Sequence, residues 1–556
     1  MDGADSELVF VALGGLGEIG MNVALYGLGP RRKRKWLMVD CGLAFADPEK
    51  AGIEIILPDL AFVEKIKRDL IGLIITHAHE DHIGAVADLW PRFRCPVFAT
   101  PFAAALLAAR LEGLADAPEI NVSTVKQGER VKLDPFDVEF VPMAHSIPES
   151  CALAIRTPHG TVLHTGDWKI DPEPGLGLPT DAARLTEIGD EGVLALVCDS
   201  TNILRDGVSP SEAEVALALR EAIGGAGGRV VVTTFASNVA RIRAVALAAK
   251  AAGRKVVLLG RAMERVVNVA RESGFLDGID PFLSGEAYSS LGREEIVLLA
   301  TGSQGEGRAA MARIAVDDHP IAKLSPGDTA IFSSRTIPGN EREVGRIINN
   351  LIKQGVEVIT DRSGLVHASG HPRRGEVAQL YDWLRPKIAV PAHGEELHLA
   401  EHALFAAERG IETVIKARNG DVVVLAPGEP AIIDEAPHGQ IARDGSILLP
   451  LESEPIRERQ RLAFAGIVTV AIAIDRKGEM AGVPDVVLTG LPEWTEAGVS
   501  LDEIVDAAVF QTFDSLPRPK RRDADIVSGA VEKAVRAAVG VVWGKKPTVH
   551  VLVIEI

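Results

Sequence analysis

The sequence predicts an α/β protein built from several domains. At 556 residues the chain is too long for one hydrophobic core, and a hydrophobic content of 47% with 24% charged residues is typical of globular proteins. Short apolar runs alternate with helix-like segments along the whole chain, and the rhythm of this alternation changes twice. The changes indicate a first domain interrupted by an insertion, and then a small separate domain.

The first part of the sequence, residues 1–208, is predicted to be rich in β-strands. Strand-like runs bounded by Gly, Pro or Asp occur at 7–15 (ELVFVALGG), 22–29 (NVALYGLG), 36–42 (WLMVDCG) and 70–79 (LIGLIITHAH). Further strands are predicted at 138–143, 151–157 and 161–167, after helices near 82–90 and 101–112. We therefore assign 1–208 to the first part of a sheet-based domain.

A second unit begins after the strand at 193–200. Ser209, Pro210 and Glu212 predict a capped helix start. Beyond it, strands at 229–235, 255–260, 295–302, 329–334 and 356–360 alternate with helices such as 238–252 and 340–354. This alternation predicts a doubly wound domain with a parallel sheet over 209–371.

The last part of the chain divides again. The strand and loop at 387–394 (KIAVPAHG), followed by strands at 413–417 and 421–427, predict that the first domain resumes over 372–450. The polar stretch 452–461 (ESEPIRERQR) indicates a linker, placed at 451–463. Strands at 466–475, 484–490 and 548–556 around two helices predict a small α+β domain over 464–556.

Composition restricts the class of protein. Cys41, Cys95, Cys151 and Cys198 have no CxxC spacing, which favours reduced thiols in a cytoplasmic protein over disulfides or a thiolate metal site. No apolar run approaches the ~20 residues that a membrane span requires, so we expect no membrane association.

The net charge of −18 disfavours nucleic-acid binding by the whole surface. An RNA substrate would need a local basic channel. Candidates are 31–35 (RRKRK), Arg241 with Arg243, Arg373 with Arg374, and 520–522 (KRR), although each could equally be a solvated loop or helix face.

The densest chemical signal is the segment 76–82 (THAHEDH), which follows a predicted strand. His77, His79, Asp81 and His82 place three imidazoles and a carboxylate in six residues of a chain with only 14 histidines. Neutral imidazole and carboxylate are natural ligands for zinc or manganese. His145 and Asp167 also follow predicted strands, and we regard them as candidate ligands only in combination with this cluster.

These residues, with Asp40 after a predicted strand, resemble the metallo-β-lactamase superfamily. Six further motifs in chain order resemble the ribonuclease J family of its β-CASP branch, and the likeness extends over nearly the whole chain. They lie at 14–22 (GGLGEIGMN), 198–202 (CDSTN), 235–238 (FASN), 301–305 (TGSQG), 367–371 (HASGH) and 391–395 (PAHGE). The sequence departs from the family pattern at 306–308 and 372–375, and neither segment contains an expected metal ligand.

The resemblance implies an αβ/βα sandwich with an inserted β-CASP domain, and two divalent metal ions per chain, Zn²⁺ or else Mn²⁺ or Mg²⁺. It implies that His77, His79 and His145 hold one ion, that Asp81, His82 and His393 hold the other, and that Asp167 bridges them. Asp199 would orient a ligand or the nucleophile, and His371 would stabilise or protonate the leaving oxygen. The pocket for a 5′-phosphate would be formed by Ala236, Ser237, Asn238, His367, Ala368, Ser369, Gly370 and His371.

The implied activity is hydrolysis of RNA, 5′-to-3′ from 5′-monophosphate ends with some endonucleolytic cutting, in the processing and decay of rRNA and mRNA. The C-terminal domain would mediate a homodimer or tetramer, and partners in an RNA-degradation complex are possible. Two other hypotheses stay open. The chain could be a hydrolase of a small thioester or lactam, but such an enzyme would not need the inserted domain. It could also be a catalytically silent scaffold, but a scaffold would not need the complete ligand set.

Overall fold

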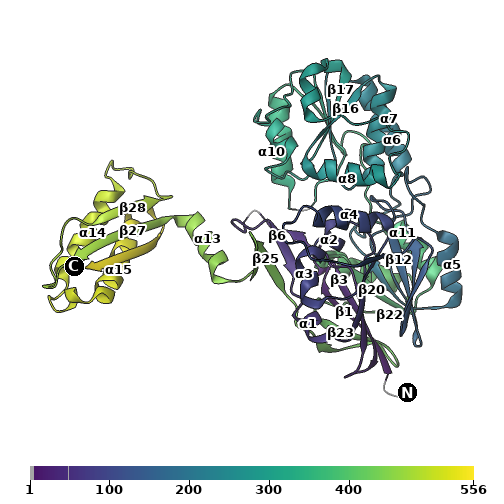
Figure 1. Cartoon of the computed structure of the whole chain (residues 1–556), viewed down its shortest axis with the longest axis horizontal. Coiled ribbons are helices and arrows are strands. Elements are labelled where there is room, and N and C mark those ends of the chain that lie inside the picture. The colour runs from purple at the N-terminus through teal and green to yellow at the C-terminus, as the bar shows by residue number, and fades with distance from the viewer. Residues whose placement is uncertain (1–5, 48, 338) are drawn as a thin grey trace. The chain divides into compact units, whose positions relative to one another are not determined.

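The computed structural model describes residues 6–47, 49–337 and 339–556 and divides into two compact units. The first comprises residues 1–44 and 57–440, and the second comprises 45–56 and 441–556. The start of the predicted first domain, residues 1–5, lies outside the described residues. Figure 1 traces the chain by residue number.

Two mixed sheets form the centre of the first unit (Figure 1). The larger sheet has the order β24-β23-β1-β3-β4-β7-β8-β9, with bounds Ala431–Glu435, Asp421–Ala426, Ser6–Gly14, Val23–Pro30, Lys35–Val39, Leu70–Ile74, Val97–Ala99 and Val122–Thr124. The other has the order β10-β11-β12-β13-β14-β20-β22, with bounds Arg130–Leu133, Phe136–Pro142, Cys151–Thr157, Gly160–His164, Val193–Asp199, Ile388–Ala392 and Thr413–Val414. Strands from 372–450 thus complete both sheets begun before residue 208.

The hydrophobic core lies between these sheets. Phe10 and Tyr26 of the larger sheet belong to one buried cluster with Phe140, Leu153 and Val390 of the other. Burial of such apolar area is the main stabilising contribution to a fold of this kind.

Helices cover the outer faces of both sheets. On the larger sheet, Trp36 packs edge-on against Phe62 of α1 (Ala61–Ile66), with ring centroids 5.3 Å apart. On the other, Leu163 and Leu196 pack with residues of α5 (Ala182–Glu191) and α11 (Arg374–Leu384). The predicted four-layer αβ/βα sandwich is therefore confirmed. The remaining helices of this part are α2 (Glu80–Ile83), α3 (Val86–Phe93), α4 (Pro101–Leu111) and α12 (Glu396–Glu408).

The inserted segment forms the predicted doubly wound domain. Its five strands are all parallel in the order β16-β17-β15-β18-β19, with bounds Lys255–Leu259, Ile296–Ala300, Val230–Thr233, Thr329–Phe332 and Glu357–Ile359. Figure 1 shows α6 (Glu212–Gly225) and α7 (Val239–Ala251) on one side of this sheet and α10 (Glu341–Lys353) on the other. The domain also contains α8 (Arg261–Glu272) and α9 (Ala310–Ile314).

The start of α6 differs from the prediction. The capping box consists of Ser211 and Glu214, whose side chain and backbone groups bond reciprocally, and the helix begins at Glu212. The predicted box at Ser209 was wrong because Ser209 N donates instead to Glu376 Oε2, at 2.8 Å. Ser209 and Ser211 each have a glutamate three residues later, so both match the capping-box pattern.

The second unit contains a three-stranded sheet of order β28-β27-β29 (Asp485–Thr489, Ile467–Ile474, Thr548–Glu555) with α14 (Leu501–Ser515) and α15 (Ala524–Trp543). Valines of both helices pack on Val468, Val470 and Ile472 of the sheet. Among the described residues, no helix is long and apolar enough to span a membrane.

Most of the predicted linker at 451–463 forms a helix, α13 (Glu454–Ala465). Ser453 occupies the position before the helix and Pro455 lies in its first turn, where proline is well tolerated. The charged side chains that suggested a linker lie on the exposed sides of the helix, whereas Ile456 is buried.

Candidate metal centre

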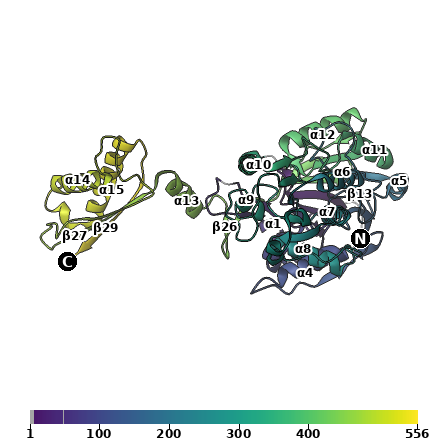
Figure 2. The same cartoon turned by 90° about the horizontal axis from the view of Figure 1, so that it is seen from above.

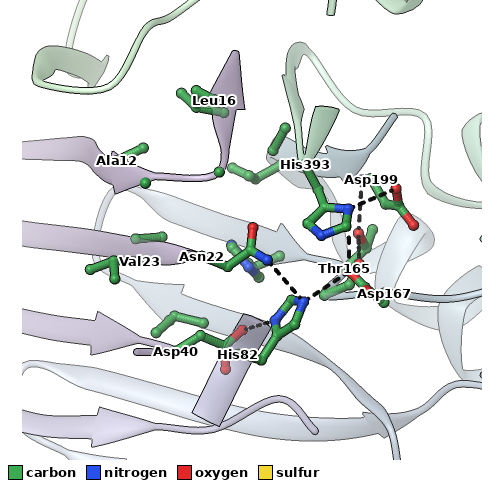
Figure 3. A pocket seen from close by; sticks show the side chains of 18 of the residues that line it. Ala12, Leu16, Asn22, Val23, Asp40, His82, Thr165, Asp167, Asp199 and His393 are labelled. Atoms are coloured by element: carbon green, nitrogen blue, oxygen red, sulfur yellow. Dashed lines mark hydrogen bonds and ion pairs between the residues drawn. The ribbon is translucent and has the colours of Figure 1, made fainter. Parts of the chain in front are cut away.

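Strand ends of both sheets bring the predicted site residues together. Parallel strands β13, β14 and β20 are neighbours, so the residues that follow or end them, Asp167, Asp199 and His393, lie at the same edge (Figure 3). The segment after β7 supplies His77, His79, Asp81 and His82, and His145 follows β11. The sharp change of direction after β20 is made at His393 itself, which has a φ of 50°.

The first potential ligand set is His77, His79, His145 and Asp167. His79 Nδ1 lies 3.1 Å from His77 Nε2 and 3.0 Å from His145 Nε2. Asp167 Oδ2 lies 3.7 Å from the Nε2 atoms of both His77 and His145. Four potential ligand atoms therefore face one small space.

The outer hydrogen bonds of these imidazoles fix which nitrogen faces that space. His145 Nδ1 lies 2.7 Å from the Gly370 carbonyl oxygen, which can only accept, so Nδ1 carries the proton and Nε2 presents its lone pair. Gly370 permits this approach, since a Cβ there would lie 2.5 Å from His145 Cε1. A carbonyl behind the imidazole is the usual way in which proteins orient a histidine ligand.

The second set is Asp81, His82, His393 and again Asp167. Asp81 Oδ2 lies 3.2 Å from His393 Nε2 and 3.6 Å from His82 Nε2. Behind His82, Nδ1 lies 2.7 Å from Asp40 Oδ2, so this carboxylate holds the Nδ1 proton and leaves Nε2 facing the site (Figure 3). Asp40 is itself held by the backbone N–H and the hydroxyl of Thr76, each at 2.8 Å.

This donor set fits two divalent ions. Within each set the ligand atoms lie within 4.8 Å of one another, and Asp167 is common to both. Asp167 Oδ1 is buried and makes no well-aligned hydrogen bond, and its nearest nitrogen, His82 Nε2, lies 3.2 Å away. A buried carboxylate that lacks hydrogen bonds is costly unless a cation compensates it. Imidazole and carboxylate ligands with a shared aspartate suit a pair of zinc or manganese ions.

Asp199 and His371 form a separate pair beside these sets. Asp199 Oδ2 accepts from His371 Nδ1 at 2.8 Å, and Oδ1 accepts from the Thr201 N–H at 2.8 Å. His371 Nε2 makes no hydrogen bond with any residue that the structure describes, and its ring stacks on His393 with centroids 5.3 Å apart. Asp199 could also contribute to a third group with Asp167, His371 and His393, but both its oxygens are already engaged.

The histidines divide into two classes by pKa. Burial lowers the pKa of His79 to about 4 and those of His77 and His145 well below the usual value. Neutral imidazoles are the form that binds a metal. For His82, His393 and His371 burial also acts downward, but nearby carboxylates outweigh it and raise the pKa, that of His393 to about 10. The largest raising effect comes from Asp167 at His82 and His393 and from Asp199 at His371.

The predicted phosphate-binding residues lie on loops of the inserted domain. Asn238 is the N-cap of α7, where Oδ1 accepts from Arg241 N at 2.9 Å. Ser369 Oγ accepts from Asn202 Nδ2 at 2.8 Å. His367 Nδ1 is buried without a hydrogen-bond partner, and burial, then Arg241, Lys169 and Arg335, lower the pKa of this imidazole. Ser237 directly precedes the helix cap, and Ala236, Ala368 and Gly370 contribute backbone to the same loops.

One predicted RNA contact is buried, and several others are paired with carboxylates. Arg241 is fully buried: its guanidinium pairs with Glu212 at 2.8 Å and donates to the carbonyl oxygens of Ser333 and Val366. It was a wrong candidate for contact with the RNA backbone, because an isolated RxR pattern does not reveal a buried partner such as Glu212. Arg31, Arg34, Lys35 and Arg374 are paired with Asp434, Glu7, Asp69 and Glu401.

Sequence reasoning missed residues that contact the predicted ligands. Asn22 Nδ2 lies 3.0 Å from His82 Nε2, and Thr201 Oγ1 lies 2.6 Å from His393 Nδ1. Both residues lie inside the motifs at 14–22 and 198–202, so the sequence indicated that these segments were important but not what these two side chains contact. Lys169 and Asp171 form a fully buried ion pair of 2.8 Å that no local pattern indicated.

Family models match almost the whole described chain. The Metallo-beta-lactamase superfamily matches residues 22–224, the Ribonuclease J beta-CASP domain 227–351, the Zn-dependent metallo-hydrolase RNA specificity domain 355–416, and the Ribonuclease J C-terminal domain 455–556. These matches agree with the predicted combination of folds.

Curated relatives match over their full length. The chain is 51% identical to Ribonuclease J of Sinorhizobium meliloti over 99% of this chain and 98% of that protein. It is 37% identical to Ribonuclease J of Mycolicibacterium smegmatis (100% and 98% covered) and 33% identical to that of Thermus thermophilus (100% and 96%). A crystal structure of a protein of unknown function from Enterococcus faecalis aligns with a TM-score of 0.53 at 16% identity, covering 75% of this chain and 100% of that one, which supports the fold alone.

Proposed function

The chain belongs to the ribonuclease J family, and from this premise we propose that it is a metal-dependent ribonuclease that hydrolyses RNA from 5′-monophosphate ends and also cuts internally. The observation that carries the proposal is the pair of ligand sets that share Asp167, placed beside the Asp199–His371 pair. A small-molecule hydrolase would need no such inserted domain, and a silent scaffold would not keep every ligand.

Two divalent ions, when bound, polarise a phosphodiester and lower the pKa of a water molecule so that it can attack phosphorus. The protein supplies the remaining parts of the reaction. As the P–O bond to the leaving group breaks, the leaving oxygen needs a proton, and His371 presents Nε2–H for this step. Asp199 holds the opposite nitrogen of that ring and so keeps its orientation and favours its protonated form.

The loops of the inserted domain support recognition of a terminal phosphate. The neighbouring strands β15 and β17 continue in opposite directions, because α7 after β15 and α9 after β17 lie on opposite faces of the sheet. Ligands of open α/β sheets bind where two neighbouring connections diverge in this way. The Ser237 and Ser369 hydroxyls offer hydrogen-bond donors there, whereas the N–H groups of Val239 and Arg241 at the start of α7 already bond to Ser237 O and Asn238 Oδ1. His367, near Arg241 and Lys169, adds a ring nitrogen that has no hydrogen-bond partner among the described residues.

The physiological ion is proposed to be Zn²⁺, because imidazoles dominate both ligand sets. We place the enzyme in the cytoplasm, acting on rRNA and mRNA, with possible partners in an RNA-degradation complex. The second unit is proposed to mediate a homodimer or tetramer. On its sheet, Val487, Leu552 and Ile554 are each more than half exposed, at 52%, 57% and 54%, and exposed apolar strands favour self-association.

Digestion of end-labelled RNA tests the proposal. One RNA labelled at the 3′ end and one labelled at the 5′ end are each prepared with a 5′-monophosphate or a 5′-triphosphate. We expect metal-dependent release of mononucleotides from the 5′ end, faster with the monophosphate, and none with His82→Ala. Absence of metal-dependent cleavage of any of these RNAs would refute the ribonuclease function; equal rates on both 5′ ends would refute only the end preference.

A further inference from the structure

A second cavity lies in the inserted domain, outside the metal centre. Its volume is about 600 Å³, within the range of small-ligand pockets. It is lined by residues that follow β16, among them Gly260, Arg261 and Arg265, and by residues that follow β17, among them Thr301 and Arg313. We call it the β16–β17 cavity.

The cavity occupies a crevice where consecutive connections leave the sheet on opposite faces. After β16 the chain enters α8, which packs beside α7. The chain then returns to the sheet at Leu283, which pairs in parallel with Val257 on the outer side of β16. After β17 it enters α9, whose residues pack with α10 in the cluster on the other face. Such a crevice at the carboxyl ends of parallel strands is the general ligand position in open α/β sheets. Figure 2 shows α8 also running beside α4, so it is held firmly.

The lining is strongly cationic. Arginines at 261, 265, 308 and 313 line the cavity with His319, in a chain whose net charge is −18. Arg261 and Arg265 are exposed, and neither forms a hydrogen bond or ion pair with any residue that the structure describes. Arg313 is held in place because its Nη2 donates to the Asp318 carbonyl oxygen at 2.8 Å.

His319 adds a neutral donor. Its Nδ1 accepts from the backbone N–H of Ala322 at 3.0 Å, so the proton of the neutral ring is on Nε2. Burial and the neighbouring Arg313 lower the pKa of this imidazole. The wall therefore offers N–H donors and positive charge.

The position of two of the arginines opposes the stability of the helix that carries them. Arg261 and Arg265 stand in the first two turns of α8, whose N-cap, Gly260, provides no side-chain acceptor. A helix N-terminus carries partial positive charge and is stabilised by anions, whereas cations there are unfavourable. A bound anion would satisfy both the uncapped N–H groups and the arginines.

We propose that the β16–β17 cavity is a second phosphate-binding site, which takes a phosphate group of a nucleotide. The phosphate could come from the backbone of an RNA strand or from a free nucleotide. The first source rests on the proposed ribonuclease function, and the second does not. In both cases paired guanidinium groups bind phosphate oxygens by charge-assisted hydrogen bonds.

Binding to the full-length protein tests this. All variants are made in the His82→Ala background, which prevents cleavage. The probes are ADP, followed by calorimetry, and a fluorescent single-stranded RNA with a 5′-hydroxyl, which lacks the terminal phosphate. Arg261→Gln/Arg265→Gln removes two cations from the cavity. The matched control, Arg346→Gln/Lys353→Gln, removes two exposed cations of α10 that do not line it.

Ala262→Glu provides a second, independent variant. It places a carboxylate in the wall without removing any arginine, and an acidic residue in the first turn favours the helix, so the variant should fold. We expect both cavity variants to weaken binding of at least one probe tenfold or more relative to the control. If the probe is RNA, the slope of log K against log salt should become shallower by about 0.7 for each lost phosphate contact.

The two probes distinguish the source of the phosphate. A loss confined to RNA assigns the cavity to the substrate strand, and a loss confined to ADP assigns it to a free nucleotide. If neither probe binds the cavity variants more weakly than the control, the proposal is overturned. Because binding is measured without catalysis, a failed ribonuclease assay would not produce that result.

Discussion

The two walls of the candidate active site differ in the kind of group that they present. The wall formed by the two central sheets presents potential ligand atoms, since His77 Nε2, His145 Nε2 and the Oδ2 atom of Asp167 converge there. The wall that we propose for the inserted domain would present donors, such as the Ser237 and Ser369 hydroxyls. One wall suits cations and the other suits anions, and a metal-bound phosphodiester needs both.

The two walls are also stabilised differently. The metal-binding wall has its ligands oriented by single hydrogen bonds from behind, as Asp40 orients His82. The donor wall rests on buried ion pairs, in which Arg241 joins Glu212 and the carbonyl oxygens of Ser333 and Val366. We therefore expect changes in the first wall to abolish chemistry, and changes in the second to alter which RNA end is used.

The largest effect is expected for His82→Ala. Because the loss of one imidazole disrupts the second ligand set, RNA cleavage should fall by at least about a thousandfold, or about 4 kcal/mol of transition-state stabilisation. Bound metal, measured by elemental analysis after desalting, should fall in parallel. His159→Ala, in the turn before β13 and so at the opposite end of that strand from Asp167, should change neither. Retention of full metal and activity by His82→Ala would contradict the assignment.

Asp199→Asn should have the next largest effect. The amide keeps the shape but no longer accepts from His371 as a charged partner, so turnover should fall by about 10²–10⁴-fold, the usual range for a lost proton donor. Metal content should remain at the wild-type level, because both Asp199 oxygens bond to His371 and Thr201. His371→Ala should give a similar loss, and the double variant should be no worse than either single one. Loss of metal from Asp199→Asn would instead make it a ligand.

His367→Ala should sharpen the contrast between the walls. It removes a ring nitrogen of the donor wall, so the preference for 5′-monophosphate over 5′-hydroxyl RNA should fall about tenfold, or about 1.4 kcal/mol. Cleavage of 5′-hydroxyl RNA and metal content should not change. His438→Ala, an exposed histidine outside both walls, serves as the control. An equal fall on both RNAs would mean that His367 supports folding of the site rather than recognition of the RNA end.

The smallest effect on catalysis is expected in the second unit. Leu552→Glu/Ile554→Glu places charges on the exposed strand β29, and should shift the protein to monomer in light scattering while turnover per site stays within about twofold. Val541→Glu, at an apolar position of α15 that is 86% exposed, is the matched control. An unchanged mass for both variants would contradict self-association through this sheet.

The sequence predicted the ligand wall far better than the donor wall. His77, His79, Asp81 and His82 lie within six residues, and strand alternation placed them at a strand end, so their convergence could be expected. The donor wall depends on contacts between distant residues. The pair of Arg241 with Glu212 and the carbonyl contact of Gly370 with His145 become visible only when the loops are folded together.

Arg241 was a wrong candidate because charge alone does not show that a side chain is buried against a carboxylate. The polar segment 451–463 is mostly helical, because a polar sequence can form a helix when only one narrow side is buried, as at Ile456 and Ala465. The parallel pairing of the inserted sheet, in contrast, could be predicted from the alternation of strands and helices.

The most direct measurement of the central claim is the number of metal equivalents that restores RNA cleavage. The full-length protein is stripped of metal with a chelator and titrated with Zn²⁺, while bound metal and cleavage of 5′-monophosphate RNA are followed together. We expect activity to saturate at two ions per chain and His82→Ala never to bind the second ion. Full activity with one ion or none per chain would contradict the two-metal site built around Asp167.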